Sequence, residues 1–384
     1  MTSELSRREV LIGGVAGLSA LAFPEWALPA LVQGEELVPF TDYPEDWTTD
    51  RGPERRFFDI RRIGAITPAD EFFTTQHYPH PRIDGSTFRL KITGLVDRER
   101  ELSLDEIRGL GRTELVAGFE CSGNSPRAMQ GLVSNGRWTG VPLRDILSQV
   151  GVKDDAREVV FFGADRGTEE VEFRGRTYEV EQQYGRSISL DKAMTPEPLV
   201  AYALNGEPLT VHQGFPLRLL MPGWYGAPNV KWLANIHVQE DPYLGKYQAR
   251  WYRTLRAEMI GGELKWKETA ITRMRLKSVV ARVTRLGDGH RVMGFALSDG
   301  TPLRSVEIRI DDGPWQAASV DNSSGEYSWK LFTYEWRDAA PGEHTLVSRA
   351  IDAHGNVQPT SEELETKKTF LEDNSQHPRT VLVS

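Results

Sequence analysis

The residues most suited to chemistry surround the only cysteine of this 384-residue chain. In the segment GFECSGNSP (118–126), an apolar run ends at Glu120, the thiol follows at Cys121, and a Gly/Asn/Ser/Pro loop begins. Rigid scaffolds present reactive groups on loops of this kind, at the ends of strands. A lone cysteine is more often a small buried hydrophobic residue, so its context has to separate the two interpretations.

Three kinds of chemistry are open to such a thiol. A nucleophilic cysteine needs a histidine base, and none of the eight histidines has a sequence context that marks it as one. A zinc site needs three or four ligands, and His77 and His80 of HYPH do not complete a recognisable pattern with one cysteine. A single thiolate does suit a soft, redox-active metal whose other ligands come from a cofactor.

A second candidate group lies in HQGFPLRLLMPGWYGAPNVKW (212–232). Arg218 and Lys231 can clamp an anionic group, and the glycines between and beside them allow the backbone to approach it closely. The alternative is that both cations face solvent at the edge of a sheet.

The elements that must position these groups predict an α+β domain over residues 31–258. Ser103 is a helix cap with Glu106 three residues later, and Gly151 closes a second helix. The predicted strands cover 86–96, 113–120, 157–165, 197–209 with a turn at Asn205-Gly206, 215–223 and 230–240, and the two helices cover 102–110 and 141–151.

The texture of the chain changes after this domain. Residues 259–270 are predicted as a linker and residues 373–384 as a C-terminal tail. Between them, residues 271–372 hold short strands separated by turns with no convincing helix, which predicts a β-sandwich of immunoglobulin type. Its strand candidates are 274–283, 290–299, 304–320, 326–336 and 342–352.

Composition narrows the class of protein. The formal net charge of -9 argues against nucleic acid as the main partner, because phosphate binding requires a basic face. The N-terminus has paired Arg7 and Arg8, an apolar stretch from Val10 to Phe23 and a small-residue site near Ala30. Residues 1–30 are therefore predicted as a twin-arginine export signal to the periplasm, with an ordinary secretory signal or membrane anchor as the alternative. The rest of the chain has no run apolar enough to span a membrane.

Five segments occur in an order that resembles the sulfite oxidase family of molybdopterin-dependent oxidoreductases. They are FECSGNS, GRWTGVPLRDIL, YALNGEPL, GFPLRLLMPG and VKWL, and the resemblance runs from about residue 57 to residue 370. It implies a sulfite-oxidase-type molybdopterin-binding domain followed by an immunoglobulin-like domain that forms a homodimer. It also implies a molybdenum-molybdopterin cofactor and gives Cys121 the role of thiolate ligand to molybdenum.

The resemblance also supplies the other site residues. Arg218 and Lys231 match the cations that hold the pterin phosphate, and either His212 or Gln213 replaces a family histidine before GFP. Trp138 matches a tryptophan near the substrate pocket, and Tyr252 a tyrosine beside the metal. The full set of implied cofactor-binding residues is Gln76, His77, Cys121, Ser122, Gly123, Asn124, His212, Gln213, Arg218 and Lys231.

Departures from the family pattern concern the substrate. Sulfite-oxidising members place arginines where this chain has Thr75, Ser125 and Pro126. Arg127, one residue further on, is a candidate catalytic substitute, and Arg304 in the sandwich is another. Because a sulfite dianion needs charge-assisted donors, sulfite is predicted to be a poor substrate. The sequences of the segments ECSGNS and GRWTGVPL are closer to those of the sulfane dehydrogenase branch.

These features predict a periplasmic molybdenum oxidoreductase that transfers an oxygen atom to or from a small, sulfur-containing substrate. A Cys-x-x-Cys-His haem motif needs two cysteines, so no haem is expected, and electrons pass to a separate carrier such as a c-type cytochrome. The alternatives are a reductase of sulfoxide-like substrates and a non-catalytic binding protein on the same fold.

Overall fold

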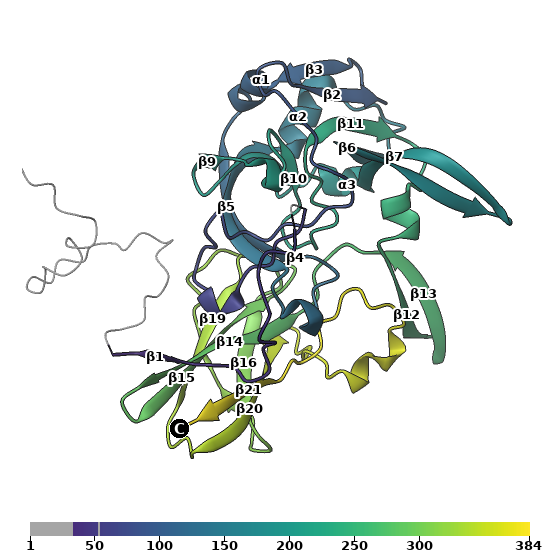
Figure 1. Cartoon of the computed structure of the whole chain (residues 1–384). Coiled ribbons are helices and arrows are strands. Elements are labelled where there is room, and N and C mark those ends of the chain that lie inside the picture. The colour runs from purple at the N-terminus through teal and green to yellow at the C-terminus, as the bar shows by residue number, and fades with distance from the viewer. Residues whose placement is uncertain (1–33, 53) are drawn as a thin grey trace, which may run out of the picture.

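The chain folds into a mixed lobe and an all-β lobe in the computed structural model, which describes residues 34–52 and 54–384 (Figure 1). The predicted export signal, residues 1–30, lies outside the described residues. Within the described part, no helix has the length and apolar character needed to cross a membrane.

Two sheets build the mixed lobe. The first joins five strands in the order β3-β2-β11-β6-β7, and only β11 and β2 run parallel. Its strands are β2 (Arg89–Gly94), β3 (Arg100–Ser103), β6 (Glu158–Phe173), β7 (Arg176–Ser189) and β11 (Leu233–Gln239). The second is antiparallel in the order β10-β8-β5-β4, with β9 on β8. Its strands are β4 (Thr113–Glu120), β5 (Val133–Pro142), β8 (Leu199–Leu204), β9 (Glu207–Pro208) and β10 (Arg218–Leu220).

The predicted helices of this lobe are confirmed. In α1 (Leu104–Gly109), Ser103 and Glu106 form a capping box that satisfies backbone donors of the first turn. In α2 (Leu143–Val150), four apolar residues at helical spacing are buried, and Gly151 ends the helix with a positive φ of 68°. The remaining helical segments are α3 (Leu190–Ala193), the 3-10 turns η1 (Ile60–Arg62), η2 (Pro126–Ala128), η3 (Val211–Gln213) and η5 (Glu362–Thr366), and the π-helical η4 (Lys246–Arg250).

The all-β lobe consists of two sheets that share one apolar core, which includes Val283 and Val292 from one sheet and Ile308 and Leu346 from the other. One sheet orders β1 (Glu36–Val38), β14 (Lys277–Leu286), β15 (Gly289–Leu297), β19 (Lys330–Trp336) and β18 (Ser319–Val320). The other orders β17 (Gln316–Ala317), β16 (Leu303–Ile310), β20 (Gly342–Asp352) and β21 (Arg379–Val383). Each of the five predicted strand segments contributes a strand.

Three segments differ from the sequence-based expectation. The predicted linker 259–270 is the end of β12 (Arg253–Ile260), a turn and all of β13 (Glu263–Ala270), which form a two-stranded hairpin. The predicted tail 373–384 contains β21, which pairs with β20. β1 precedes the mixed lobe in the chain, yet it completes the edge of a sandwich sheet beside β14.

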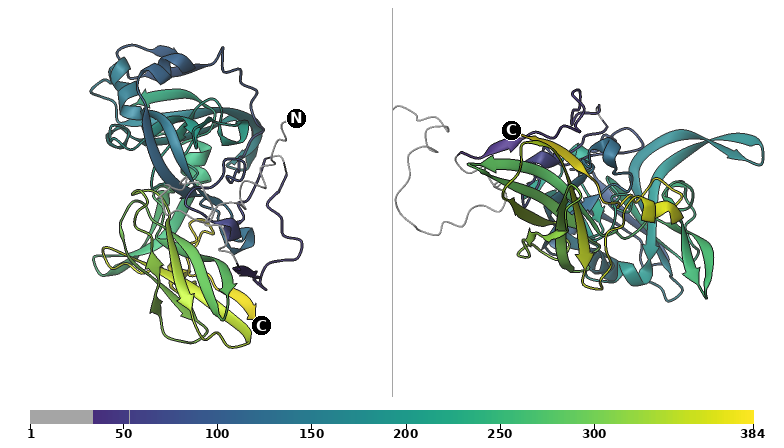
Figure 2. Two further views of the ribbon diagram at one scale, coloured as in Figure 1. Left: turned by 90° about the vertical axis from the view of Figure 1, so that its left-hand side faces the viewer. Right: turned by 90° about the horizontal axis from the view of Figure 1, so that it is seen from below.

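The two lobes are joined by a shared apolar core. The left view of Figure 2 shows the two lobes stacked one above the other. Phe119 of β4 belongs to the same cluster as Phe295 and Trp329 of the sandwich. Trp329 Nε1 also donates a hydrogen bond of 3.0 Å to the Gly64 carbonyl. The C-terminal end of β4 therefore lies against the second lobe, and this is where the cysteine loop begins.

Candidate active site

The loop after β4 is held by a buried amide. Asn124 Nδ2 donates to Glu120 Oε2 at 2.9 Å and to the Gln130 carbonyl at 3.1 Å, and its Oδ1 accepts from Leu132 N at 3.0 Å. The Asn124 N–H also donates to the Cys121 carbonyl at 2.8 Å. Asn124 therefore shapes the loop that presents Cys121.

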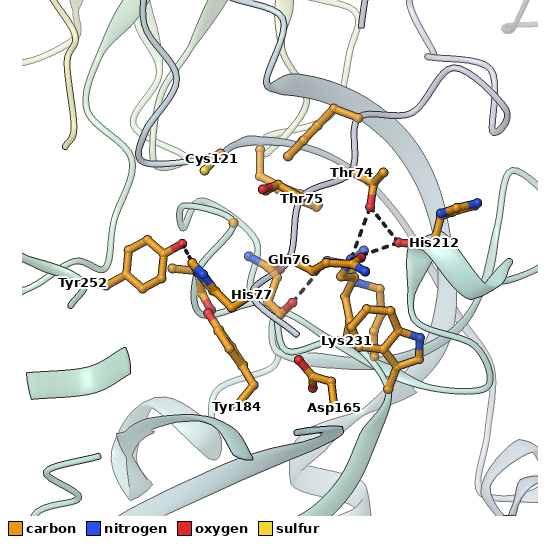
Figure 3. Close-up of a pocket in the computed structure, with 17 residues that line it drawn as sticks. Thr74, Thr75, Gln76, His77, Cys121, Asp165, Tyr184, His212, Lys231 and Tyr252 are labelled. Atoms are coloured by element: carbon orange, nitrogen blue, oxygen red, sulfur yellow. Dashed lines mark hydrogen bonds between the residues drawn. The ribbon is translucent and has the colours of Figure 1, made fainter. Parts of the chain in front are cut away.

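Cys121 lines a cavity together with polar and aromatic side chains (Figure 3). Ser122, Gly123 and Asn124 lie in the loop outside its wall. The lining residues are Phe73, Thr74, Thr75, Gln76, His77, Phe119, Cys121, Asp165, Tyr184, His212, Arg218, Gly226, Ala227, Asn229, Lys231, Trp232 and Tyr252.

Lys231 marks one side of the cavity. Its Nζ donates to Thr74 Oγ1 at 3.2 Å, to Gln76 Oε1 at 3.1 Å and to the His212 carbonyl at 3.1 Å. Burial, together with the nearby charge of Arg218, lowers the pKa of Lys231 to about 7. All three acceptors are neutral, so an anion in the cavity would favour the charged amine.

Arg218 is the second cation and is more deeply buried. Its Nη atoms donate to the carbonyls of Gln213 at 3.2 Å and Asn229 at 3.3 Å, and burial lowers its pKa to about 9. The guanidinium lies over the Trp138 indole, 4.9 Å from the ring centre, and over Phe119. Trp138 is fully buried there, and its Nε1 donates to a backbone carbonyl. It was predicted near the substrate pocket, but it does not line the cavity. It supports Arg218 by a cation–π contact.

Three buried polar atoms face this cavity without a hydrogen-bond partner in the described part of the chain. They are Arg218 Nε, Gln76 Nε2 and Asp165 Oδ1. Burial raises the pKa of Asp165 to about 6, with Lys231 acting in the opposite direction. Buried polar groups are almost always paired, so two donors and one acceptor left open indicate a polar ligand. Sequence reasoning missed Asp165, although a carboxylate at the end of the predicted strand 157–165 was a usable signal.

Cys121 and Tyr252 lie on the other side of the cavity from Lys231 and His212 (Figure 3). Tyr252 Oη and His77 Nε2 are 2.7 Å apart, and the imidazole stacks on Tyr247 with ring centres 4.7 Å apart. Burial and the charge of Lys246 lower the pKa of His77 to about 4, so its ring is neutral at physiological pH. Tyr184, which sequence reasoning missed, completes this wall and donates to the Ala227 carbonyl at 2.7 Å.

The thiol is not set up as a free nucleophile. Burial raises the pKa of Cys121, and His77 bonds to Tyr252. A reactive cysteine requires a lowered pKa, whereas a metal ligand is deprotonated by the metal itself. Of the described residues, no three or more His, Cys, Asp or Glu side chains gather as a metal site. The geometry therefore favours a single thiolate that completes the ligand set of a cofactor-borne metal.

Two further predicted residues lie outside this cavity wall. Gln213 donates to the Ala69 carbonyl at 2.6 Å and caps Thr210 N with its Oε1, so it fixes the loop while His212 lines the cavity. Arg127, predicted as a catalytic substitute, lines a separate surface cavity together with Lys367 and Phe370.

Comparisons with known proteins are consistent with this geometry. The family described as "Oxidoreductase molybdopterin binding domain" matches residues 77–247. The chain is 32% identical over 332 residues to mitochondrial sulfite oxidase of Homo sapiens, an alignment that covers 77% of this chain and 57% of that protein. It is 29% identical over 338 residues to sulfite oxidase of Arabidopsis thaliana, and that alignment covers 78% of this chain and 83% of that protein.

A solved structure extends the similarity to nearly the whole chain. The sulfane dehydrogenase SoxCD from Paracoccus pantotrophus superposes with a TM-score of 0.73 at 25% identity. This alignment covers 89% of the present chain and 90% of the matched one.

Proposed function

Because the chain belongs to the sulfite oxidase family of molybdopterin-dependent oxidoreductases, we propose that it transfers an oxygen atom to or from a small sulfur compound. One observation carries the proposal. A single cavity joins a partly buried thiol, Cys121, to a polar wall with two cations, the buried Arg218 and the partly buried Lys231. A metal ligand and an anion clamp are the two requirements of a cofactor with a metal at one end and a phosphate at the other.

The residues present fit molybdenum-molybdopterin. Arg218 and Lys231 would hold the phosphate, and their lowered pKa values mean that this anion would favour both charges. Gln76 Nε2 and Asp165 Oδ1, a donor and an acceptor without partners in the described chain, would bind the polar edge of the pterin. Cys121 would supply the thiolate. When bound, the cofactor supplies the two-electron redox chemistry and oxygen transfer, while the protein sets access and electrostatics.

The chain's own residues would keep the reacting side dry and in position. The phenol of Tyr252 is only 8% exposed, and burial raises its pKa, so it remains protonated. Its oxygen lies 2.7 Å from neutral His77, which fixes the hydroxyl beside the thiol. Tyr252 would therefore orient a substrate oxygen by hydrogen bonding.

The substrate side carries less positive charge than sulfite-oxidising members have. Among the described residues, Arg218 and Lys231 are the only Arg or Lys side chains in the cavity lining, and Thr75 stands where those members have an arginine. Arg127 and Arg304 do not line the cavity. A charge-assisted hydrogen bond contributes about 1.5–3 kcal/mol. Sulfite should therefore bind more weakly than in a dedicated sulfite oxidase.

The setting of the reaction is part of the same proposal. In the oxidative direction, water supplies the oxygen atom, and two protons and two electrons leave for a separate carrier such as a c-type cytochrome. The paired Arg7 and Arg8 support twin-arginine export to the periplasm. We assign the C-terminal lobe as an immunoglobulin-like sandwich, which its two sheets and shared core support, and its role in dimerisation follows from the family resemblance alone.

Metal analysis and a substrate panel test the proposal. Protein matured in cells that make the cofactor should contain about one molybdenum per chain, measured by mass spectrometry. Reduction of an artificial electron acceptor should then follow addition of one of several sulfur compounds, including sulfite, thiosulfate and an organic thiol. Turnover of a sulfoxide with a reduced dye would establish the reductive direction. Molybdenum-free protein after full maturation would refute the assignment and favour the binding protein.

A further inference from the structure

A cation lies near the Cys121 cavity in a segment that sequence reasoning did not assign to the site. Residues 50–52 and 54–56 belong to a small hairpin in which Arg51 N donates to the Arg55 carbonyl at 3.0 Å. The returning strand continues onto the cavity wall, because Arg56 and Thr74 exchange both backbone hydrogen bonds, at 2.9 and 3.0 Å. Arg55 is therefore the residue opposite Thr75 in an antiparallel pair.

The side chains around this pair alternate between two faces. Arg56 Nη1 donates to the Asp70 carbonyl, and Arg56 and Thr74 line a neighbouring cavity. Successive side chains of an extended strand point to opposite faces, so Arg55 shares the face of Thr75, which lines the Cys121 cavity. Directly opposite Cβ atoms are about 4.5–5.5 Å apart, well within the length of an arginine side chain.

Electrostatic effects agree with this placement. Burial raises the pKa of the Cys121 thiol, and the charge of Arg55 opposes the rise. The same charge acts on the Tyr252 hydroxyl and on the His77 ring. All three groups belong to the Cys121 side of the cavity (Figure 3). The adjacent Glu54 acts instead on Lys231, so the charges of Arg55 and Glu54 act on opposite sides of the cavity.

Arg55 is also available to bind. It is exposed, its guanidinium lies 5.3 Å from the centre of the Phe57 ring, and it makes no ion pair with the residues that the structure describes. The whole chain carries a net charge of -9, which repels anions at long range. An exposed cation near the cavity is thus the feature that would admit a negatively charged substrate.

We propose that Arg55 binds the anionic oxygens of the substrate and takes, from the opposite strand, the place that Thr75 leaves without a cation. This inference rests on the proposed function and sharpens it. The substrate is a small sulfur oxyanion that approaches past Arg55 toward Cys121, with one cation where a dedicated sulfite oxidase has several. Its affinity depends on Arg55, whereas turnover at saturation depends on the cavity groups.

Molybdenum-loaded wild type and Arg55→Ala are compared by steady-state kinetics with sulfite and by calorimetric titration with inorganic sulfate. Loss of one charge-assisted hydrogen bond should raise the Michaelis constant and the sulfate dissociation constant about 10- to 100-fold, with kcat within about threefold. Arg55→Lys should lie between the two. Arg51→Ala is the matched control, because Arg51 contacts the same Phe57 ring, and it should change either constant by less than about threefold.

A strand swap tests the geometry itself. In the Arg55→Thr background, Thr75→Arg moves the cation across the pair and should recover at least about tenfold of the lost sulfate affinity. Equal constants for wild type and Arg55→Ala, or equal losses in Arg51→Ala, would overturn the inference while leaving molybdenum content and turnover intact. Absence of molybdenum or of any turnover in wild type would instead refute the proposed function.

Discussion

Strand β4, which ends at Glu120 just before Cys121, is tied to the second lobe by a buried ion pair, and removal of this pair gives a quantitative prediction. Lys277, the first residue of β14, donates from Nζ to Glu120 Oε2 at 3.1 Å and to the Asp373 carbonyl at 2.9 Å. The side chains of Lys277 and Glu120 are 1% and 2% exposed. Replacing Lys277 with methionine keeps most of the volume and leaves the Glu120 carboxylate with Asn124 as its one remaining side-chain donor among the described residues.

A buried charge without a partner strongly destabilises the folded state. Breaking a buried pair by removing one partner costs about 3–5 kcal/mol, a large part of the 5–15 kcal/mol that typically stabilises a folded protein. Burial already raises the pKa of Glu120 in the native protein, and loss of Lys277 should raise it further. A carboxyl with a raised folded pKa destabilises the protein above its unfolded pKa. The penalty of Lys277→Met should therefore be largest near pH 8 and shrink as the pH falls toward 5.

Urea unfolding followed by tryptophan fluorescence measures this effect. Lys277→Met should lose about 3–5 kcal/mol of unfolding free energy near pH 8, and adding Glu120→Gln should recover about half of it or more. Lys91→Met is the matched control, because its partner Glu101 is 3.5 Å away and both side chains are more than half exposed. Its expected loss is about 0–1 kcal/mol. A single Lys277 variant as stable as this control, or a double variant no more stable than the single one, would refute the reasoning.

Three further outcomes follow from the site and the N-terminus. Cys121→Ser should abolish turnover and molybdenum retention while leaving the urea midpoint unchanged, because an alkoxide suits a soft metal poorly; wild-type rates would remove the ligand assignment. The pKa of Lys231, lowered to about 7 by burial, should rise when an anionic cofactor binds. Cofactor retention after dialysis should then weaken as the pH increases from about 6 to 8, below the pKa of Arg218, and most of this slope should be lost in Lys231→Met. Arg7→Lys with Arg8→Lys should leave the precursor in the cytoplasm by cell fractionation, and mature protein in the periplasm would refute the signal.

The sequence predicted the elements whose signals are local. The capping residues Ser103 and Glu106 marked α1, and the apolar run before Cys121 matched β4. Asn205 and Gly206 marked a hairpin turn and both have positive φ. In each case the responsible contacts lie within a few residues of one another, so short-range pattern and propensity were sufficient.

Residues brought in from distant segments were not predictable in this way. Asp165 reaches the cavity from an irregular point inside β6, between Phe162 and Arg166, and Arg55 is placed beside Thr75 by a hairpin whose pairing with Thr74 is set by tertiary structure. The sequence context of Trp138 matches the family, but its side chain packs beneath Arg218 and does not reach the cavity. Sequence position defined which segments surround the site, and only the packing defined which side chains face into it.

The segments predicted as linker and tail lie next to residues that hold the Cys121 loop in place. The Ser122 carbonyl, next to Cys121, accepts a hydrogen bond of 2.6 Å from Glu372 N. The buried Glu372 carboxylate lies 3.5 Å from Arg256 of the hairpin strand β12.

Lys277 completes this support from β14. It bonds to Glu120 on one side of Cys121 and to the Asp373 carbonyl beside Glu372 on the other. A metal ligand has to be held within about 0.5 Å of its working position by the residues around it. The hairpin, the sandwich strand and the C-terminal segment hold the loop from three directions, and none of them is close to Cys121 in the sequence. The second lobe therefore serves the active site by fixing the position of the cysteine, in addition to any role that it has in dimerisation.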